Sequence, residues 1–366
     1  MPTIDGVTSV CRSALSQQLR YIPALDGVRA IAAFMVMVFH WFQLSTDRNG
    51  HVFQQLSRYA VFGQTGVDLF FVLSGFLITR IILKTRDHHA YFRNFYARRA
   101  LRIFPLYYGF LFVFFCLIPP EPAAQTAPNG LLWYCFYLQN IQSTFGSVPV
   151  YGPGHFWSLA IEEHFYLIWP VLIFFVNLRR VPLIIVMMLI VAIGSRALLL
   201  AMGEGVFYFT LCRLDGLATG CFLAWLEFSK GDLARYRNRM LLILLLIVPI
   251  LGVSWFYTGG HGLAIVQITK FTLLGIAYAA VVGLVVGLPN SNMISAGLAS
   301  LPFAWLGAIS YGLYVFHPVC FGFTNKLVSN GGVSLVVGVA ATVAIASLSY
   351  MIFEKRFLAL KKFFVR

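Results

Sequence analysis

Charged side chains are scarce in this sequence. Aspartate, glutamate, lysine and arginine make up 11% of the 366 residues, 59% are hydrophobic, and the mean hydropathy is +0.80. This balance excludes a soluble globular domain, whereas a bilayer requires apolar runs of about 20 residues. The sequence predicts an all-α polytopic membrane bundle with about ten transmembrane helices. The expected spans are residues 25–44, 65–84, 103–119, 157–177, 181–202, 206–228, 240–257, 262–288, 302–323 and 333–354.

Patterns that indicate metal or redox chemistry are missing as well. The six cysteines show no C-x-x-C or cysteine–histidine spacing, so we expect neither disulfides nor zinc, and no metal at the functional site. The sequence also lacks a glycine-rich phosphate loop, a G-x-S-x-G turn and an H-E-x-x-H motif. The common nucleotide-binding, serine-hydrolase and metallopeptidase signatures are thereby excluded.

Acidic residues are outnumbered, with 13 Asp and Glu against 27 Lys and Arg, and the basic residues are concentrated in alternate connections between the spans. Cytoplasmic loops of membrane proteins carry such an excess. We therefore expect both termini in the cytoplasm, with an N-terminal arm at 1–20, a membrane domain at 21–356 and a basic tail at 357–366. The net charge of +14 then reflects topology and attraction to membrane lipids, and no nucleic-acid partner is expected.

Two ionisable residues lie inside the first apolar run. Arg29 and His40 are eleven residues apart, which on an α-helix is about three turns and a rise of about 16–17 Å. Both therefore lie on one helix face, about half a bilayer apart. Ionisable groups within a span indicate a pathway or a reactive site. The alternative is an arginine that snorkels at one helix end and a histidine at the opposite interface.

The expected topology sorts the remaining polar residues into two clusters. The outer halves of the spans contain His40, Asp68, Glu162, Glu163, Arg213 and His317. The cytoplasmic side contains Arg29, Arg99 and Arg102. The sequence thus predicts a polar outer cluster and a strongly basic inner cluster on opposite sides of the bilayer.

Seven segments, in order along the chain, resemble the membrane acyltransferase-3 family. They are the Arg-x10-His pattern of the first span and residues 66–78, 99–107, 156–163, 213–217, 310–318 and 349–355. The resemblance implies a ten-helix bundle in the plasma membrane (the bacterial inner membrane) that moves acyl groups, commonly acetyl, from cytoplasmic acyl-CoA to hydroxyls of extracytoplasmic glycans or lipid-linked sugars. The residues that this family requires are Arg29, His40, Arg99 and Arg102 in this sequence.

The chemistry of these four residues suits such a reaction. Planar guanidinium groups recognise phosphates, so we expect Arg99 and Arg102 to hold the phosphates of acyl-CoA, with acetyl-CoA as the expected donor. Arg29 would lie along the pantetheine arm or at the mouth of its channel. The imidazole of His40 is suited to remove the proton of an acceptor hydroxyl.

Several further residues are candidates for the site. A carboxylate on the other ring nitrogen would orient the imidazole, and Glu162 is favoured by its motif and Asp68 by its position at the outer end of the adjacent span. Glu163, Tyr311 and His317 are candidates for acceptor binding. Glu163 is equally explained as an outer-surface charge, and His317 as a hydrogen-bonding residue between helices.

The sixth span contains residues with mainly structural explanations. Arg213 is a candidate for acceptor binding, but Arg213 and Asp215 are two apart and point to different helix faces, so each is expected to bond to another helix. Gly216 and Gly220 are expected to allow close packing between helices.

Two departures from the family pattern limit what the resemblance implies. Position 164 is histidine where many members have glutamine, and the sequence stops about a dozen residues after the last span, without the soluble hydrolase-like domain of some members. We expect a stand-alone form that acylates its acceptor directly. A polytopic transporter of a small polar or proton-coupled solute and a scaffold with a degenerate site are the alternatives, and the oligomeric state is left open.

Overall fold

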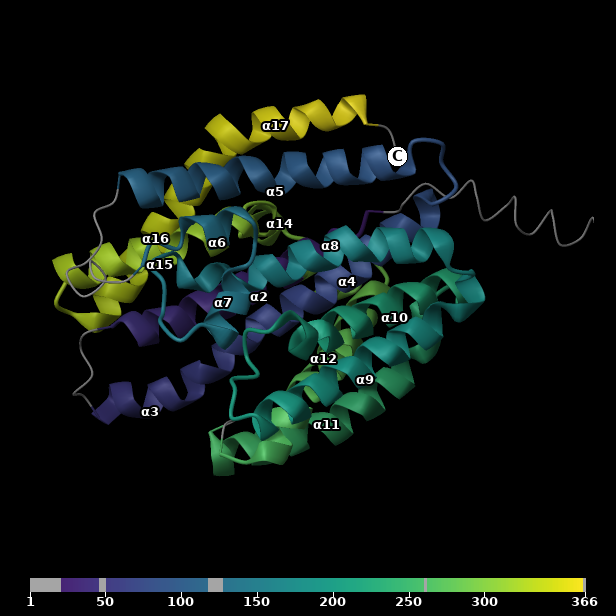
Figure 1. Ribbon diagram of the computed structural model, residues 1–366, viewed down its shortest axis with the longest axis horizontal. Helices are drawn as coiled ribbons and strands as arrows, with labels where there is room; N and C mark the ends of the chain where they lie inside the picture. The colour runs from purple at the N-terminus through teal and green to yellow at the C-terminus, as the bar shows by residue number, and fades with distance from the viewer. Residues whose placement is uncertain (1–20, 46–50, 118–127, 260–261, 365–366) are drawn as a thin grey trace, which may run out of the picture.

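The computed structural model describes residues 21–45, 51–117, 128–259 and 262–364 (Figure 1). Over these residues the chain is helical and contains no β-strand, only one isolated bridge between Asn129 and Tyr151. The predicted all-α bundle is confirmed. The expected N-terminal arm, residues 1–20, lies outside the described residues.

The described residues form sixteen α-helices. They are α2 (Ala24–Leu44), α3 (His51–Ala60), α4 (Gly66–Thr85), α5 (Tyr91–Cys116), α6 (Leu131–Cys135), α7 (Gln139–Phe145), α8 (Trp157–Phe175), α9 (Val181–Ala201), α10 (Leu214–Lys230), α11 (Arg237–Thr258), α12 (Ala264–Gly287), α13 (Met293–Leu298), α14 (Leu301–Ala308), α15 (Ser310–Leu327), α16 (Gly331–Ser349) and α17 (Lys355–Ala359).

Eight helices of the described residues are long and apolar enough to cross a bilayer, and α14 with α15 forms a ninth span if this bent pair counts as one. The predicted ninth span is therefore not one straight helix, since α14 and α15 meet at an angle of 73°. The predicted span 206–228 is also shorter than expected. Its first residues form a loop and a 3-10 turn, and α10 itself has 17 residues.

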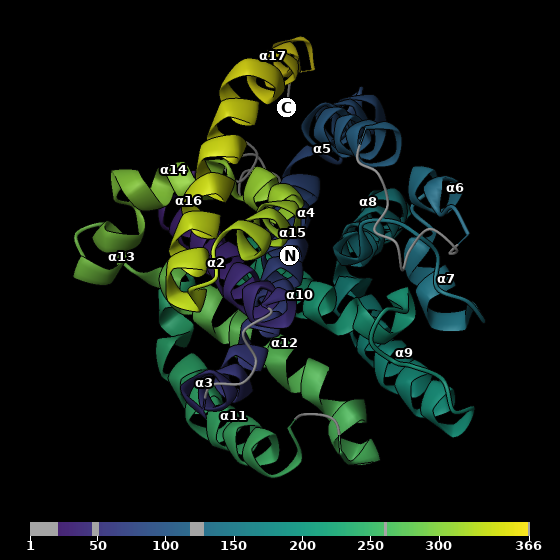
Figure 2. The ribbon, with the colours of Figure 1, turned by 90° about the vertical axis from the view of Figure 1, so that its left-hand side faces the viewer.

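Helices α2 and α4 lie in the middle of the bundle, and α2 contacts α4, α12, α14 and α15 (Figures 1 and 2). The contact between α4 and α10 is especially close because glycines face it. A Cβ atom at Gly75 would overlap the carbonyl oxygen of Leu217, and one at Gly220 would overlap that of Val72. The predicted packing role of Gly220 is confirmed, and it resembles the small-residue contacts of other membrane helices.

Helix α11 shows how the bundle meets its apolar surroundings. Its large side chains, among them Leu245, Leu246 and Phe256, are mostly exposed. A helix that is apolar all round and yet exposed suits contact with lipid chains rather than with water.

The segment expected as a tail, 357–366, is folded as far as the structure describes it. After α16 the chain continues through a π-helical turn (Tyr350–Glu354), α17 and a 3-10 turn (Leu360–Phe363). Helix α17 lies beside the middle of α5 (Figure 1). Arg98 of α5 fixes the end of the chain there, donating hydrogen bonds to the carbonyl oxygens of Lys361 (3.0 Å) and Phe364 (2.6 Å).

We predict that Gly220→Ala lowers the melting temperature of the detergent-purified protein. The added methyl group would push α4 and α10 apart, at a cost of about 1–3 kcal/mol. The matched control is Gly252→Ala on the exposed face of α11, where an added Cβ meets nothing within 4 Å. Equal melting temperatures for the two variants would contradict the close contact.

Candidate functional site

An elongated cavity of about 350 Å³ lies among α2, α4, α5, α8 and α15. Along α4 its lining runs from Val67 to Ile81, a rise of about 21 Å at 1.5 Å per residue. Six of the residues predicted from the sequence line it: Arg29, Arg99, Arg102, Glu162, Glu163 and Tyr311. The structure therefore brings the predicted donor-binding arginines into one space with two of the predicted carboxylates.

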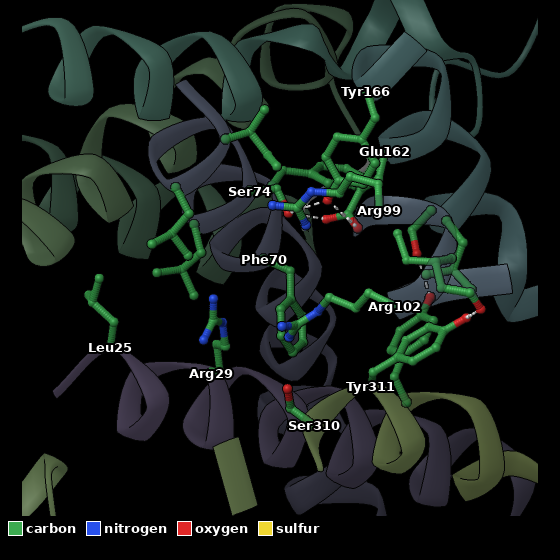
Figure 3. Close-up of a pocket in the computed structure, with 18 of the residues that line it drawn as sticks. Leu25, Arg29, Phe70, Ser74, Arg99, Arg102, Glu162, Tyr166, Ser310 and Tyr311 are labelled. Atoms are coloured by element: carbon green, nitrogen blue, oxygen red, sulfur yellow. Dashed lines mark hydrogen bonds between the residues drawn. The ribbon is translucent and has the colours of Figure 1, made fainter. Parts of the chain in front are cut away.

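The arginines give this cavity a positive wall. The side chains of Arg29, Arg99 and Arg102 point into the same space from α2 and α5 (Figure 3). Arg29 is held by Asp26, one turn before it, through an ion pair of 2.6 Å, and Asp26 also accepts a hydrogen bond from Tyr21. An acid three residues before a base on a helix supports this geometry. Arg99 and Arg102, also three apart, reach the cavity from one face of α5.

Glu162 is fixed near Arg99 by two hydroxyl groups (Figure 3). Ser74 Oγ donates to Glu162 Oε1 (2.5 Å) and Tyr166 Oη to Oε2 (3.1 Å), while the two hydroxyls lie 3.0 Å apart. The guanidinium carbon of Arg99 lies 5.2 Å from the centre of the Tyr166 ring. Glu162 thus belongs to the arginine-lined part of the cavity. Tyr166 shares its helix face at four-residue spacing, whereas nothing in the sequence indicated Ser74 on α4.

Tyr311 lines the same cavity with its hydroxyl already engaged. It donates to the carbonyl oxygen of Ile103 on α5 at 3.1 Å. This bond ties α15 to α5 beside Arg102. Because the Tyr311 hydroxyl already donates its proton to this carbonyl oxygen, it helps to shape the cavity rather than to stabilise an oxyanion.

His40 and His317 form a second polar cluster. His40 Nδ1 lies 3.0 Å from the carbonyl oxygen of Val36 and 3.0 Å from Nε2 of His317, and His317 Nδ1 lies 3.1 Å from the carbonyl oxygen of Leu313. Because a carbonyl oxygen only accepts, each ring has its proton on Nδ1. The His40 Nδ1–H is then shared between Val36 and His317, and Nε2 of His40 carries a free electron pair.

A third histidine, which the sequence did not single out, completes this cluster. The ring centre of His155 lies 5.3 Å from that of His317, and its Nε2 lies 3.2 Å from the carbonyl oxygen of Val315. His155 and His317 are buried, at 8% and 0% exposure, whereas His40 is partly exposed. Of the three histidines, His40 is therefore the least buried.

Tyr314 joins the cavity to the histidines. It lines the cavity, and its ring centre lies 5.5 Å from that of His155 and 5.7 Å from that of His317. Its hydroxyl lies 2.6 Å from Ser158 Oγ and donates to the carbonyl oxygen of His155 (2.5 Å). One side chain of α15 thus borders both polar clusters.

Among the described residues the structure brings no carboxylate to His40, contrary to the expectation for Glu162 or Asp68. Asp68 pairs with Arg213 (2.8 Å), and the guanidinium carbon of Arg213 lies 3.7 Å from the centre of the Phe271 ring. The position of Asp68 has a physical cause. The buried guanidinium of Arg213 needs a counter-charge, and Asp68 of the closely packed helix α4 is the one that it meets.

A neighbouring pair strengthens this structural explanation. Arg196 of α9 bonds Asp215 at 2.7 Å, and Thr272 of α12 donates to the same carboxylate oxygen at 2.9 Å. The prediction that Arg213 and Asp215 bond to other helices rather than to each other is confirmed. Arg213 is therefore part of an ion-pair network between helices, outside the cavity that the arginines line.

We predict that Asp68→Ala reduces the yield and the melting temperature of folded protein, because it leaves Arg213 buried without its counter-charge. Breaking such a pair costs about 3–5 kcal/mol. Arg213→Met added to Asp68→Leu should recover part of the loss. The control is Asp87→Ala, since Asp87 is 76% exposed in its pair with Arg86 and such pairs contribute about 1 kcal/mol or less. An Asp68→Ala protein as stable as the control would contradict a structural role.

The comparisons with known proteins agree with this arrangement. The model of a family of acyltransferase domains, acyltransferase-3, matches residues 22–354. The chain is 27% identical to the O-acetyltransferase OatA of Staphylococcus aureus over 92% of its own length and 57% of the relative's. It is 27% identical to the peptidoglycan O-acetyltransferase OatA of Listeria monocytogenes over 92% of its length and 55% of the relative's.

The chain thus spans a little over half the length of these curated relatives. No solved structure matches it. The family model, in contrast, covers nearly the whole sequence, from the first turn of the arginine- and histidine-bearing helix to the π-helical turn after α16. The chain belongs to the acyltransferase-3 family of multi-pass membrane proteins.

Proposed function

We propose that this protein moves an acyl group, acetyl in the first instance, from acyl-CoA on the cytoplasmic side to a hydroxyl of a glycan on the other side of the plasma membrane. The observation that carries the proposal is that the cavity and the histidine cluster are neighbours. The cavity with three arginines runs along α4, and Tyr314, which lines it, has its ring centre 5.7 Å from that of His317. The names of the relatives support O-acetyl transfer as the reaction to test. The name of one of them also offers peptidoglycan as the first acceptor to test.

The donor would enter at the end where the basic residues are concentrated. Arg99 and Arg102 present planar guanidinium groups suited to phosphate, and Arg29 faces them across the cavity. The neutral pantetheine arm would follow the cavity along α4. Arg29 and His40, about 16–17 Å apart on α2, then mark the two ends of the path.

The chemical step would use Nε2 of His40, the ring nitrogen with the free electron pair. It takes the proton of the acceptor hydroxyl as the hydroxyl oxygen attacks the thioester carbonyl. The tetrahedral intermediate collapses by breaking the bond between carbon and sulfur, and the proton passes from His40 to the departing thiolate. His317, at Nδ1 of His40, takes the place expected for a carboxylate and holds the ring in the tautomer that this step needs.

Acetyl-CoA should raise the melting temperature of the wild-type protein and of His40→Ala, but not of Arg99→Ala. A ligand that binds only the folded form stabilises it, by about 2.7 kcal/mol at a concentration 100 times its Kd. His40→Ala should meanwhile lose transfer to a glycan acceptor by about 10²–10⁴-fold. Absence of any shift in the wild-type protein at saturating acetyl-CoA would favour another donor or the transporter alternative. Full transfer by His40→Ala would remove His40 from the chemical step.

His317→Ala should lower kcat on the order of 100-fold with an unchanged KM for acetyl-CoA, because the His40 ring is no longer held in place while donor binding is untouched. His317→Gln should recover much of the rate, since its amide oxygen can accept the hydrogen bond from His40 Nδ1. A purely structural role for His317 would instead lower the amount of folded protein and leave kcat per folded molecule unchanged in His317→Ala.

A further inference from the structure

A second, smaller cavity of about 60 Å³ adjoins the first at the beginning of α5. The two cavities share Ile81, Arg99 and Arg102 in their linings. The rest of the second lining comes from the end of α4, the following turn, the first turns of α5 and the 3-10 turn after α17: Thr85, His88, Tyr91, Asn94, Phe95, Arg98 and Lys361. Arg99 and Arg102 thus belong to both cavities.

The charge of the second cavity differs from that of the first. Among the described residues its lining includes four Lys and Arg residues and a histidine, and no Asp or Glu. The first cavity includes Asp26, Glu162 and Glu163 beside its arginines. Of the two cavities, the smaller one is therefore the one without an acidic residue in its described lining that would repel a dianion.

The folded end of the chain builds this space. Tyr91, Asn94, Phe95, Arg98 and Arg102 recur at intervals of three and four residues, so they lie on one face of α5. The guanidinium of Arg98 donates hydrogen bonds to the carbonyl oxygens of residues 361 and 364, in and just after the 3-10 turn that follows α17. That anchoring places Lys361 in the lining of the cavity, although Lys361 is 259 positions from Arg102 in the sequence.

We propose that this second cavity binds the phosphate monoester of coenzyme A, the 3′-phosphate of its nucleotide, with Lys361 as the residue that recognises it. The inference rests on the proposed donor. It adds that the diphosphate lies at Arg99 and Arg102, between the two cavities, and that the pantetheine arm continues into the first. A space of about 60 Å³ has room for a few water molecules, which suits one phosphate group.

The charges of the possible ligands support this assignment. A phosphate monoester carries about −1.5 to −2 at neutral pH, more than a phosphodiester. Lysine binds phosphate as a point charge and needs no bidentate geometry. The phosphodiester of an anionic lipid headgroup is also a phosphate but carries a smaller negative charge. It is the other source of such a ligand at a cytoplasmic membrane surface.

The test compares acetyl-CoA with acetyl-dephospho-CoA, which lacks only the 3′-phosphate. Binding to the full chain in nanodiscs of neutral phosphatidylcholine is measured by titration. Wild type should bind acetyl-CoA roughly tenfold or more tightly than the dephospho form, as expected for one charged hydrogen bond. Lys361→Ala should bind the two forms equally, and Lys361→Arg should keep most of the preference.

The matched control is Lys362→Ala, the neighbouring lysine, whose ammonium lies 5.1 Å from the centre of the Phe363 ring and does not line the cavity. It should keep the wild-type preference. Equal binding of both forms by wild type, or a preference that survives in Lys361→Ala, would overturn the proposal while leaving a CoA donor in place.

Two further outcomes are distinguishable. If neither form binds wild type, the proposed donor itself fails, and this inference fails with it. If nanodiscs that contain phosphatidylglycerol abolish the preference for acetyl-CoA at constant ionic strength, the cavity is a lipid-headgroup site and the assignment to coenzyme A is overturned. An unchanged preference in both lipids supports the nucleotide phosphate.

Discussion

A charge inside an apolar bundle must meet an opposite charge or reach water, and the interior of this protein is arranged around that requirement. Asp68 with Arg213 and Arg196 with Asp215 satisfy it by pairing between helices. In the cavity, Arg29 is also paired, with Asp26 of its own helix, and it shares with Arg99 and Arg102 an open space between the helices. The ion pairs that join helices thus differ from the arginines of the cavity, which line the space that the proposed donor would occupy.

Helix α2 connects the two halves of the proposed reaction. It carries Arg29 into the arginine-lined cavity and His40 into the histidine cluster, and it lies in the middle of the bundle with α4, α12, α14 and α15 around it. Helix α15 supplies the matching groups, with Tyr314 at the end of the cavity and His317 against His40. The proposed sites of donor binding and of proton transfer thus lie at different heights on α2, and α15 contacts both.

The break between α14 and α15 makes this neighbour possible. Helix α14 packs across the beginning of α2, where a Cβ atom at Gly307 would overlap the carbonyl oxygen of Asp26. The chain then turns by 73° and α15 runs along α2 past His40. Hydropathy could not reveal this break, because both pieces are apolar and no proline stands at the bend between Ala308 and Ser310.

The sequence by itself determined the class of fold and the grouping of Arg29, Arg99 and Arg102. It also determined the number of apolar segments, except at the bent pair α14 and α15 and at the short helix α10. These follow from composition and from helical spacing, which are local properties. Only the tertiary structure decided the partners: His317 rather than a carboxylate at His40, Arg213 at Asp68, and Lys361 beside Arg102. The partner of each side chain depends on which helices meet and on how far along each helix they meet. Packing between segments that are distant in the sequence sets both the choice of helices and the point of contact.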